Sequence, residues 1–164
     1  MDVEVLVFQA AERLFAVRAS GVVEVLRAAT LAPFPDADPA VEGVLSLRGS
    51  LVPVISIPAL LDTDAAPMQH CDHLIVVRMD KATLALRVER AIDLVVLHSD
   101  RQSNEDAGQP GNATAMREEW IELVGKTAHG IVYVLDVKRL LSEQGFARVL
   151  HLLRLHAASQ EVST

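Results

Sequence analysis

Four consecutive residues, His70-Cys71-Asp72-His73, form the one cluster in the chain with side chains of metal-ligand type. His73 begins a run rich in β-branched residues and is predicted to open a strand, in which successive side chains point to opposite faces. The four side chains could not then converge on one ion, and no second cysteine pair completes a tetrahedral site. We expect an ordinary polar turn here, with no metal and no other cofactor.

A second segment, Val124-Gly125-Lys126-Thr127, ends like a phosphate-binding loop. That motif requires a glycine five positions before Gly125, where this chain has Trp120, and the residues that follow do not begin a helix. Three serines (Ser46, Ser50 and Ser56) lack a nearby His and Asp pattern for nucleophilic catalysis. The motifs therefore predict a protein that is not an enzyme.

The composition excludes further classes of function. The chain has 164 residues, of which 15 are Lys or Arg and 22 are Asp or Glu, so its formal net charge is −7. Nucleic acids and anionic membrane surfaces require concentrated basic residues, which are missing. The single cysteine excludes an internal disulfide framework, and the first residues have no basic segment of a signal peptide. We expect a soluble, cytoplasmic protein.

The elements that position these residues are predicted to be strands. Apolar runs of strand length, separated by turn residues at intervals of about 8–12, indicate an all-β barrel or sandwich. The polar segment 99–116 predicts a long flexible loop. In the segment 145–164, apolar residues recur at helical spacing, at Phe146, Val149, Leu150 and Leu153. We expect this amphipathic helix to pack on the barrels, with partner binding as the alternative.

Two alignments of the chain with itself indicate an internal repeat. Phe15–Leu26 aligns with Leu84–Val95, and Val52–Leu61 aligns with Val132–Leu141. The second pair of segments is further apart than the first, which corresponds to an insertion at the polar loop. Each copy has roughly 60–70 residues, which is marginal for an independent domain, so the copies should share buried surface.

The segment Val41–Ile55 resembles the signature of the CheW family. It contains Gly-Val, then Leu-Arg-Gly, then an apolar pair and Pro-Val-Ile, in the family's order. The opening strand around Val5, the Val-x-Glu stretch that ends at Glu24, the prolines from Pro33 and the closing segment Val132–Leu141 also match in order. The resemblance covers residues 3 to about 141.

Membership of this family implies two linked five-stranded SH3-like barrels, which agrees with the repeat. It implies a CheW-like domain over residues 3–144, with barrels at roughly 10–70 and 71–141, followed by the helix and tail at 145–164. It implies a non-catalytic adaptor that couples methyl-accepting receptors to the regulatory domain of a CheA-type histidine kinase. Such adaptors act in the cytoplasm, at receptor arrays on the inner face of the membrane.

The same resemblance assigns candidate site residues. Receptor contacts are expected at Val22, Glu24, Gly43, Arg48, Gly49 and Val88. Kinase contacts are expected at Val41 and Leu45, with a place in the core as the equal alternative. Because Glu24 and Arg48 have opposite charges and the fold that the resemblance implies brings their strands into one barrel, we predict an ion pair between them.

Departures from the family pattern leave two other functions open. Ser46 replaces the family's Asn, Ser56-Ile57-Pro58 replaces Asp-Leu-Arg, and Val88-Glu89 replaces Val-Asp. These changes suit a divergent paralogue that scaffolds an array for pili or surface growth. A ligand-binding barrel unrelated to signalling is the other alternative, because fold alone does not determine function.

Overall fold

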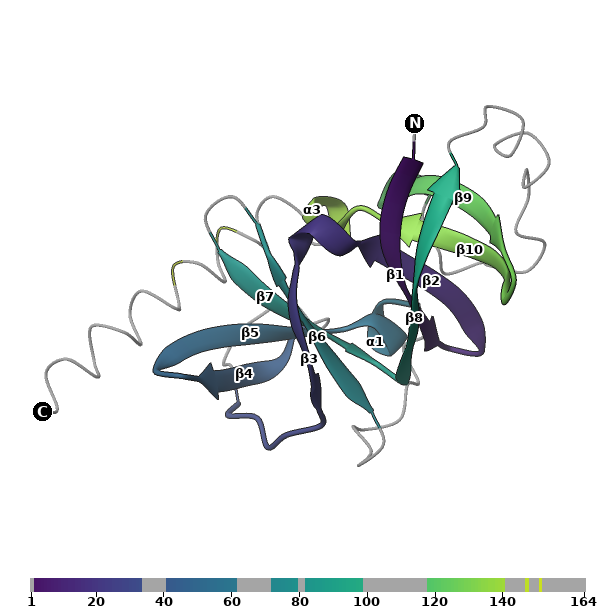
Figure 1. Ribbon diagram of the computed structural model, residues 1–164. Coiled ribbons are helices and arrows are strands. Elements are labelled where there is room, and N and C mark those ends of the chain that lie inside the picture. Colours follow the sequence, from purple (N-terminus) through teal and green to yellow (C-terminus); the bar gives the residue numbers. More distant parts are fainter. Residues whose placement is uncertain are drawn as a thin grey trace, which may run out of the picture.

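The part of the chain that the structure describes is mostly β, with short helical turns between strands (Figure 1). The computed structural model describes residues 2–33, 41–61, 72–79, 82–98 and 118–140, and the single residues 147 and 151. The elements in chain order are β1 (Asp2–Ala10), β2 (Arg13–Arg18), η1 (Ala19–Gly21), β3 (Val22–Arg27), β4 (Val41–Leu47), β5 (Ser50–Ser56), α1 (Ile57–Leu61), β6 (His73–Arg78), β7 (Thr83–Val88), β8 (Arg90–His98), η2 (Glu118–Trp120), β9 (Ile121–Thr127), β10 (Gly130–Leu135) and α3 (Val137–Leu140).

The strands form two five-stranded sheets, which confirms the expected fold class. Sheet A has the order β8-β1-β2-β10-β9, and sheet B has the order β3-β6-β7-β5-β4. In sheet B, an additional bridge between Ala32 and Val44 joins the chain after β3 to β4. We call the two units barrel A and barrel B.

The sheets do not divide the chain at the expected place, between segments 10–70 and 71–141. Barrel A combines β1 and β2 with β8, β9 and β10, and barrel B combines β3, β4 and β5 with β6 and β7. The chain crosses from barrel A to barrel B after β2 and returns after β7. Each barrel therefore takes two strands from one copy of the repeat and three from the other, which ties together two units that would be marginal alone.

The strand registers confirm the repeat. Sheet B pairs β5 with β7 in parallel, with Val54 opposite Ala85, and sheet A pairs β10 with β2 in parallel, with Val134 opposite Ala16. Under the two sequence alignments Val54 corresponds to Val134 and Ala85 corresponds to Ala16, so these two parallel pairs are equivalent. Under the same alignments the strand order of sheet B becomes that of sheet A, so the halves are related throughout by a pseudo-twofold arrangement.

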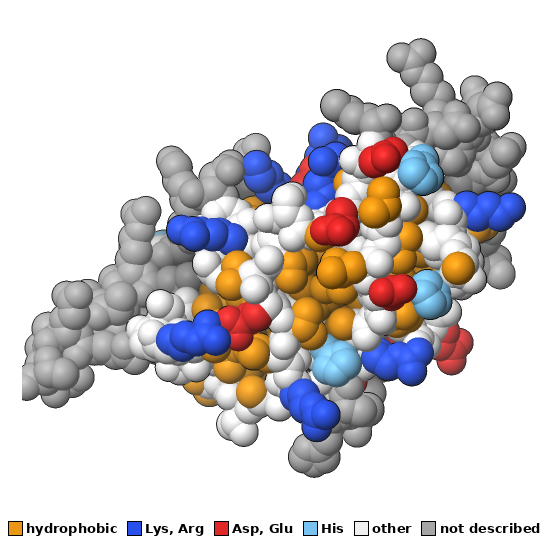
Figure 2. Space-filling view, viewed as in Figure 1, with side chains coloured by type: hydrophobic (Ala, Val, Ile, Leu, Met, Phe, Trp, Pro, Cys, Tyr) orange, Lys and Arg blue, Asp and Glu red, His pale blue; other side chains and the backbone are white. Residues whose placement is uncertain are grey.

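Two strands from different barrels, β3 and β8, run in opposite directions across the face shown in Figure 1. They are equivalent under the repeat, and both carry exposed apolar side chains, namely Val23 and Val25 on β3 and Leu94 and Val96 on β8. On this face hydrophobic side chains gather across the middle of the molecule, with charged side chains around them (Figure 2).

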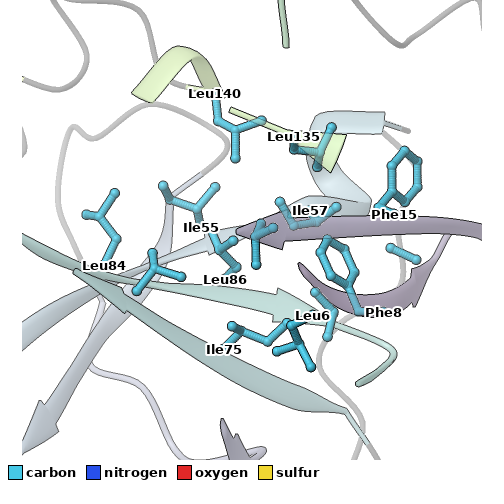
Figure 3. Close-up of a cluster of buried hydrophobic side chains, with 14 of the residues drawn as sticks. Leu6, Phe8, Phe15, Ile55, Ile57, Ile75, Leu84, Leu86, Leu135 and Leu140 are labelled. Carbon is cyan, nitrogen blue, oxygen red and sulfur yellow. The ribbon is translucent and has the colours of Figure 1, made fainter. Parts of the chain in front are cut away.

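Alternating side chains divide the core into three clusters. On β1, Val5 and Val7 point into barrel A, while Leu6 and Phe8 point into a larger cluster between the barrels. Figure 3 shows this central cluster, to which both sheets and α3 contribute. The rings of Phe8 and Phe15 lie 6.0 Å apart in it. Each fully buried large side chain stabilises the fold by about 1.5–3 kcal/mol, so the shared cluster holds the barrels together.

Some expected elements are outside the described residues. These are the polar loop at 99–116 and nearly all of the helix and tail at 145–164, of which only residues 147 and 151 are described, as helical. A short helix, α3, follows β10, and its Leu140 is buried against the central cluster. Within the described part of the chain, no helix is long and apolar enough to cross a membrane.

Candidate functional site

Glu24 and Arg48 form the ion pair that the sequence predicts. Arg48 Nη1 donates to Glu24 Oε2 at 2.6 Å, and Arg48 Nη2 donates to Glu24 Oε1 at 3.2 Å. The arginine side chain is 74% exposed and the glutamate side chain 20%. Two parallel hydrogen bonds fix the guanidinium plane, and the exposed arginine leaves part of its edge open to a partner.

A tight turn between β4 and β5 positions Arg48. Leu47 pairs with Ser50, so Arg48 and Gly49 are the two turn residues. Their φ angles are 49° and 84°. Positive φ at both positions is typical of a type I′ turn, which matches the twist of the flanking strands. Gly49 adopts it without cost, whereas Arg48 does so against the preference of a residue with a Cβ.

Strand β3, which carries Glu24, presents apolar side chains on both of its faces. Val22, Glu24 and Leu26 are half-buried, while Val23 and Val25 are exposed. Val22 packs against the central cluster, so the candidate site is continuous with the core between the barrels. The site thus consists of an apolar strand surface beside a charged pair. We call the pair of Glu24 and Arg48 the Glu24–Arg48 clasp.

Four of the expected site residues are inside the protein. Val41 and Val88 belong to the central cluster and Leu45 to the core of barrel B, so Val41 and Leu45 occupy the core places that the sequence left open as an alternative. A Cβ on Gly43 would come within 2.7 Å of the Ala32 carbonyl oxygen. This glycine therefore permits the close approach of the chain after β3.

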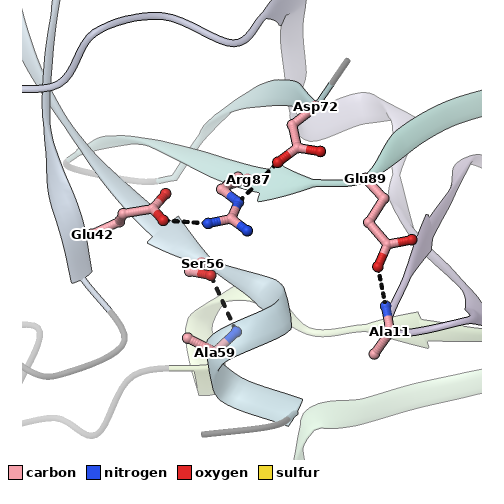
Figure 4. A network of polar contacts seen from close by, with 7 residues as sticks. All are labelled: Ala11, Glu42, Ser56, Ala59, Asp72, Arg87 and Glu89. Carbon is pink, nitrogen blue, oxygen red and sulfur yellow. Dashed lines mark hydrogen bonds and ion pairs between the residues drawn. The ribbon is translucent and has the colours of Figure 1, made fainter. Parts of the chain in front are cut away.

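Sequence reasoning missed a buried polar network in barrel B (Figure 4). Arg87, whose side chain is 4% exposed, pairs with Glu42 on β4, and its Nε lies 3.3 Å from Asp72 Oδ2. The available signal was an arginine between apolar residues of a strand that is buried on both faces. In barrel A the equivalent arginine, Arg18, pairs with Glu122, which is equivalent to Glu42, but this pair is at the surface.

Two departures from the family pattern have local structural roles. Ser56 Oγ accepts a hydrogen bond from Ala59 N at 3.1 Å at the start of α1. The equivalent Asp136 Oδ1 accepts one from Lys138 N at 3.1 Å before α3, so the serine performs the capping that an aspartate performs in the other half. Glu89 Oε1 accepts a hydrogen bond from Ala11 N at 2.9 Å and supports the strained β1–β2 turn.

The cluster of metal-ligand residue types is dispersed. His73 is on β6, where its Nδ1 accepts a hydrogen bond from Ala91 N at 2.9 Å, and Asp72 pairs with Arg87. His70 and Cys71 are outside the described residues. Among the residues that the structure does describe, no group of three or more His, Cys, Asp and Glu side chains could hold a metal ion.

Two surface pairs in barrel A shift the ionisation of their members. The hydrogen bond with Glu122 raises the pKa of Arg18. The hydrogen bond with His98, at 2.7 Å, and the charge of that histidine lower the pKa of Asp2. Both pairs are exposed, so they influence the surface charge more than the stability of the fold.

Comparison with known proteins gives consistent results. The family model for the CheW-like domain matches residues 4–145. The chemotaxis protein CheW of Treponema pallidum (strain Nichols) is 23% identical over 154 residues, which cover 91% of this chain and 88% of that protein. The crystal structure of the scaffolding protein TtCheW from Thermoanaerobacter tengcongensis matches with a TM-score of 0.70 and 22% identity, covering 88% of this chain and 91% of that one.

A double β-barrel with an apolar strand surface beside a charged pair defines a module that is suited to protein–protein interaction. The family model matches nearly the whole length of the chain, which shows that the chain belongs to the CheW-like domain family. It is therefore a CheW-like protein.

Proposed function

We propose that this protein couples methyl-accepting receptors to the regulatory domain of a CheA-type histidine kinase, without catalysing a reaction itself. It would do so in the cytoplasm, at receptor arrays. The observation that supports the proposal best is the Glu24–Arg48 clasp beside the exposed side chains of Val23 and Val25. An apolar surface supplies contact area, and a charge at its rim fixes the orientation of the partner.

We assign receptor contact to Val22, Glu24, Arg48 and Gly49, which are on β3 and the adjacent turn. Gly43 and Val88 would support that surface from within, because a tight approach and the central cluster surround them. We assign kinase contact to β4, one of the two edge strands of sheet B, where Val41 and Leu45 would hold the strand in place from the core.

The test is Arg48→Glu in the full chain. An exposed pair contributes about 0–1 kcal/mol to stability, so the circular dichroism spectrum and the melting temperature should hardly change. Receptor binding should weaken and receptor-stimulated kinase activity should disappear, while binding to the isolated kinase regulatory domain persists. Arg18→Glu is a matched control, because Arg18 is also an exposed, paired arginine but is on β2.

Two results would contradict the proposal. If Arg48→Glu folds and supports receptor-stimulated kinase activity as well as the unmodified protein does, the receptor site is elsewhere. If the unmodified protein binds neither partner, the alternatives of a paralogue for another array or a ligand-binding barrel gain support. Co-purification with a CheA-type kinase other than the one tested separates these two, since only the paralogue would bind one.

A further inference from the structure

Both barrels contain a β-bulge at the same place in an edge strand. In sheet B the pairing of β4 with β5 passes over Glu42, so no residue of β5 lies opposite it. In sheet A the pairing of β9 with β10 passes over Glu122 in the same way. The extra residue of a bulge bends its strand and turns its side chain in a new direction. The repeat therefore carries a glutamate at an equivalent bulge in each half.

In barrel B the bulged glutamate reaches past β5 to Arg87 on β7. β5 lies between β7 and β4 in the sheet, and its Ser56 is opposite Arg87. Figure 4 shows the guanidinium group of Arg87 between the carboxylates of Glu42 and Asp72. The ion pair of Glu42 and Arg87 thus joins two strands that are not neighbours in the sheet. The bulge of β4 cannot straighten without breaking this buried pair.

A third charged residue distinguishes barrel B from barrel A. Asp72 is buried, and its Oδ2 lies 3.3 Å from Arg87 Nε. Its carbonyl oxygen accepts a hydrogen bond from Ala28 N at 2.9 Å, which fixes Asp72 against the chain after β3. With the offset of the first alignment, the residue of barrel A equivalent to Asp72 is Val3. In barrel A the arginine–glutamate pair is at the surface. The bulge in barrel B is therefore held from the interior.

Strand β4 is the strand to which the proposed function assigns kinase contact. On its outer side Val44 is bridged to Ala32: Ala32 N donates to the Val44 carbonyl at 2.9 Å, and Val44 N donates to the Ala32 carbonyl at 2.8 Å. This bridge holds the middle of the strand, while the buried network holds its beginning at Glu42. A strand held at both places presents its edge in one arrangement, so a partner does not have to order it on binding.

We propose that Arg87, Glu42 and Asp72 form a positioning network, which keeps the bulge of β4 in one arrangement and thereby shapes the edge that the kinase regulatory domain contacts. The inference rests on the proposed function, because it requires kinase contact at β4. Arg87 and Asp72 are buried, so they act through β4 without touching the kinase. Apolar residues often replace a whole buried ion network without loss of stability, but they lack its directional bonds. The network is therefore expected to contribute position more than stability.

The main experiment compares Glu42→Ala with Glu122→Ala, which remove the same side chain from equivalent bulges. Glu42→Ala leaves Arg87 paired with Asp72, so the charges of that pair stay balanced and the variant should fold. Amide hydrogen exchange followed by NMR reports the local opening of β4, with the amides of β6 as the internal reference. Isothermal titration calorimetry measures binding of a purified kinase regulatory domain.

We expect Glu42→Ala to make exchange in β4 about tenfold faster relative to β6. Binding of the kinase regulatory domain should become about tenfold weaker, which corresponds to ~1.4 kcal/mol. Glu122→Ala should change neither quantity, because its pair is exposed and is in the other barrel.

A triple variant separates position from stability. Arg87→Met, Glu42→Leu and Asp72→Leu together remove these three charges, so the midpoint of urea unfolding should approach that of the unmodified chain. The amides of β4 should nevertheless exchange fast, and binding of the kinase regulatory domain should remain weak, because no directional bond then fixes the bulge.

Three results would overturn the inference and leave the proposed function standing. Glu42→Ala could leave both exchange in β4 and kinase binding unchanged, or Glu122→Ala could weaken kinase binding equally; in either case the network does not position β4. The triple variant could recover kinase binding together with stability, in which case the network acts through stability alone. If the unmodified chain does not bind the kinase regulatory domain, the proposed kinase contact fails and the inference fails with it.

Discussion

The two equivalent arginines allow the effect of burial on an ion pair to be measured within one protein. Arg87 and Arg18 occupy the same place in the repeat, and each pairs with a glutamate at the same relative position. Arg87 is 4% exposed and Arg18 is 53% exposed. We predict that Arg87→Leu destabilises the protein strongly and that Arg18→Leu hardly does.

The magnitudes follow from what each substitution leaves behind. Arg87→Leu removes the cation between Glu42 and Asp72, and the Asp72 side chain is itself buried. Removing one partner of a buried pair costs about 3–5 kcal/mol, because a carboxylate stays in the interior without that counter-charge. Arg18→Leu removes an exposed pair, which is worth about 0–1 kcal/mol. Both variants retain much of the aliphatic volume of the side chain.

Urea unfolding followed by circular dichroism gives both free energies. For a protein of this length each kcal/mol corresponds to about 2–4 °C in melting temperature, so Arg87→Leu should melt at least ~6 °C lower. Equal effects of the two substitutions would refute the reasoning. A triple substitution of Arg87, Glu42 and Asp72 by apolar residues should recover much of the loss, since the charges of this network are then removed together.

Three further predictions concern packing, backbone strain and ionisation in barrel A. In Gly125→Ala the new Cβ would lie 2.7 Å from Leu97 Cδ2. Unfolding experiments should therefore show a cost of about 1–3 kcal/mol; Leu97→Ala should cost less in the Gly125→Ala background than in the unmodified protein, and purely additive effects would contradict the packing argument. Glu12 has a positive φ of 62°, and the free energy that a residue with a Cβ loses there is larger than the cost of the extra backbone entropy of a glycine in the unfolded chain. Glu12→Gly should therefore stabilise the protein by about 0.5–1 kcal/mol. An unchanged or lower melting temperature would show that the turn is not strained. His98→Ala should raise the pKa of Asp2 toward 3.8, measured by NMR titration of the side-chain carboxyl. The Asp2–His98 pair lowers the pKa of Asp2, so the small contribution of this pair to the stability of the fold is present above the ordinary pKa and is lost as the pH falls through the lowered pKa. An unchanged pKa of Asp2 in His98→Ala would contradict the hydrogen bond.

The local pattern was sufficient to predict the strands and the repeat. Alternation places Val5 and Val7 on one face, and the two sequence alignments alone convert the pair Val54–Ala85 into Val134–Ala16. The exchange of strands between the barrels was not predictable in this way. A strand has the same period of two whichever sheet it joins, so the local pattern does not say that the chain crosses over after β2.

The same limit applies to the candidate site. The clasp was predictable because its two charges matched positions of a known motif. The role of Arg87 was not, because its partner Glu42 is 45 residues away and nothing local links them. Leu45 could be core or surface by residue type, and only the packing of β4 on β5 decides that it is core.

The repeat also distinguishes what the hairpin needs from what the site needs. Both halves close β4–β5 and β9–β10 with two turn residues. In barrel A these are Ala128 and His129, which are both among the described residues, and neither has a positive φ. A hairpin at this place therefore closes without an arginine and without a strained residue at the first turn position; its positive φ, of 122°, is at Gly130. Arg48 accepts the strain of φ = 49° and remains mostly exposed, which the turn does not require. Strain that the fold can avoid supports the proposal that the Arg48 side chain is used for the charge that it presents beside β3.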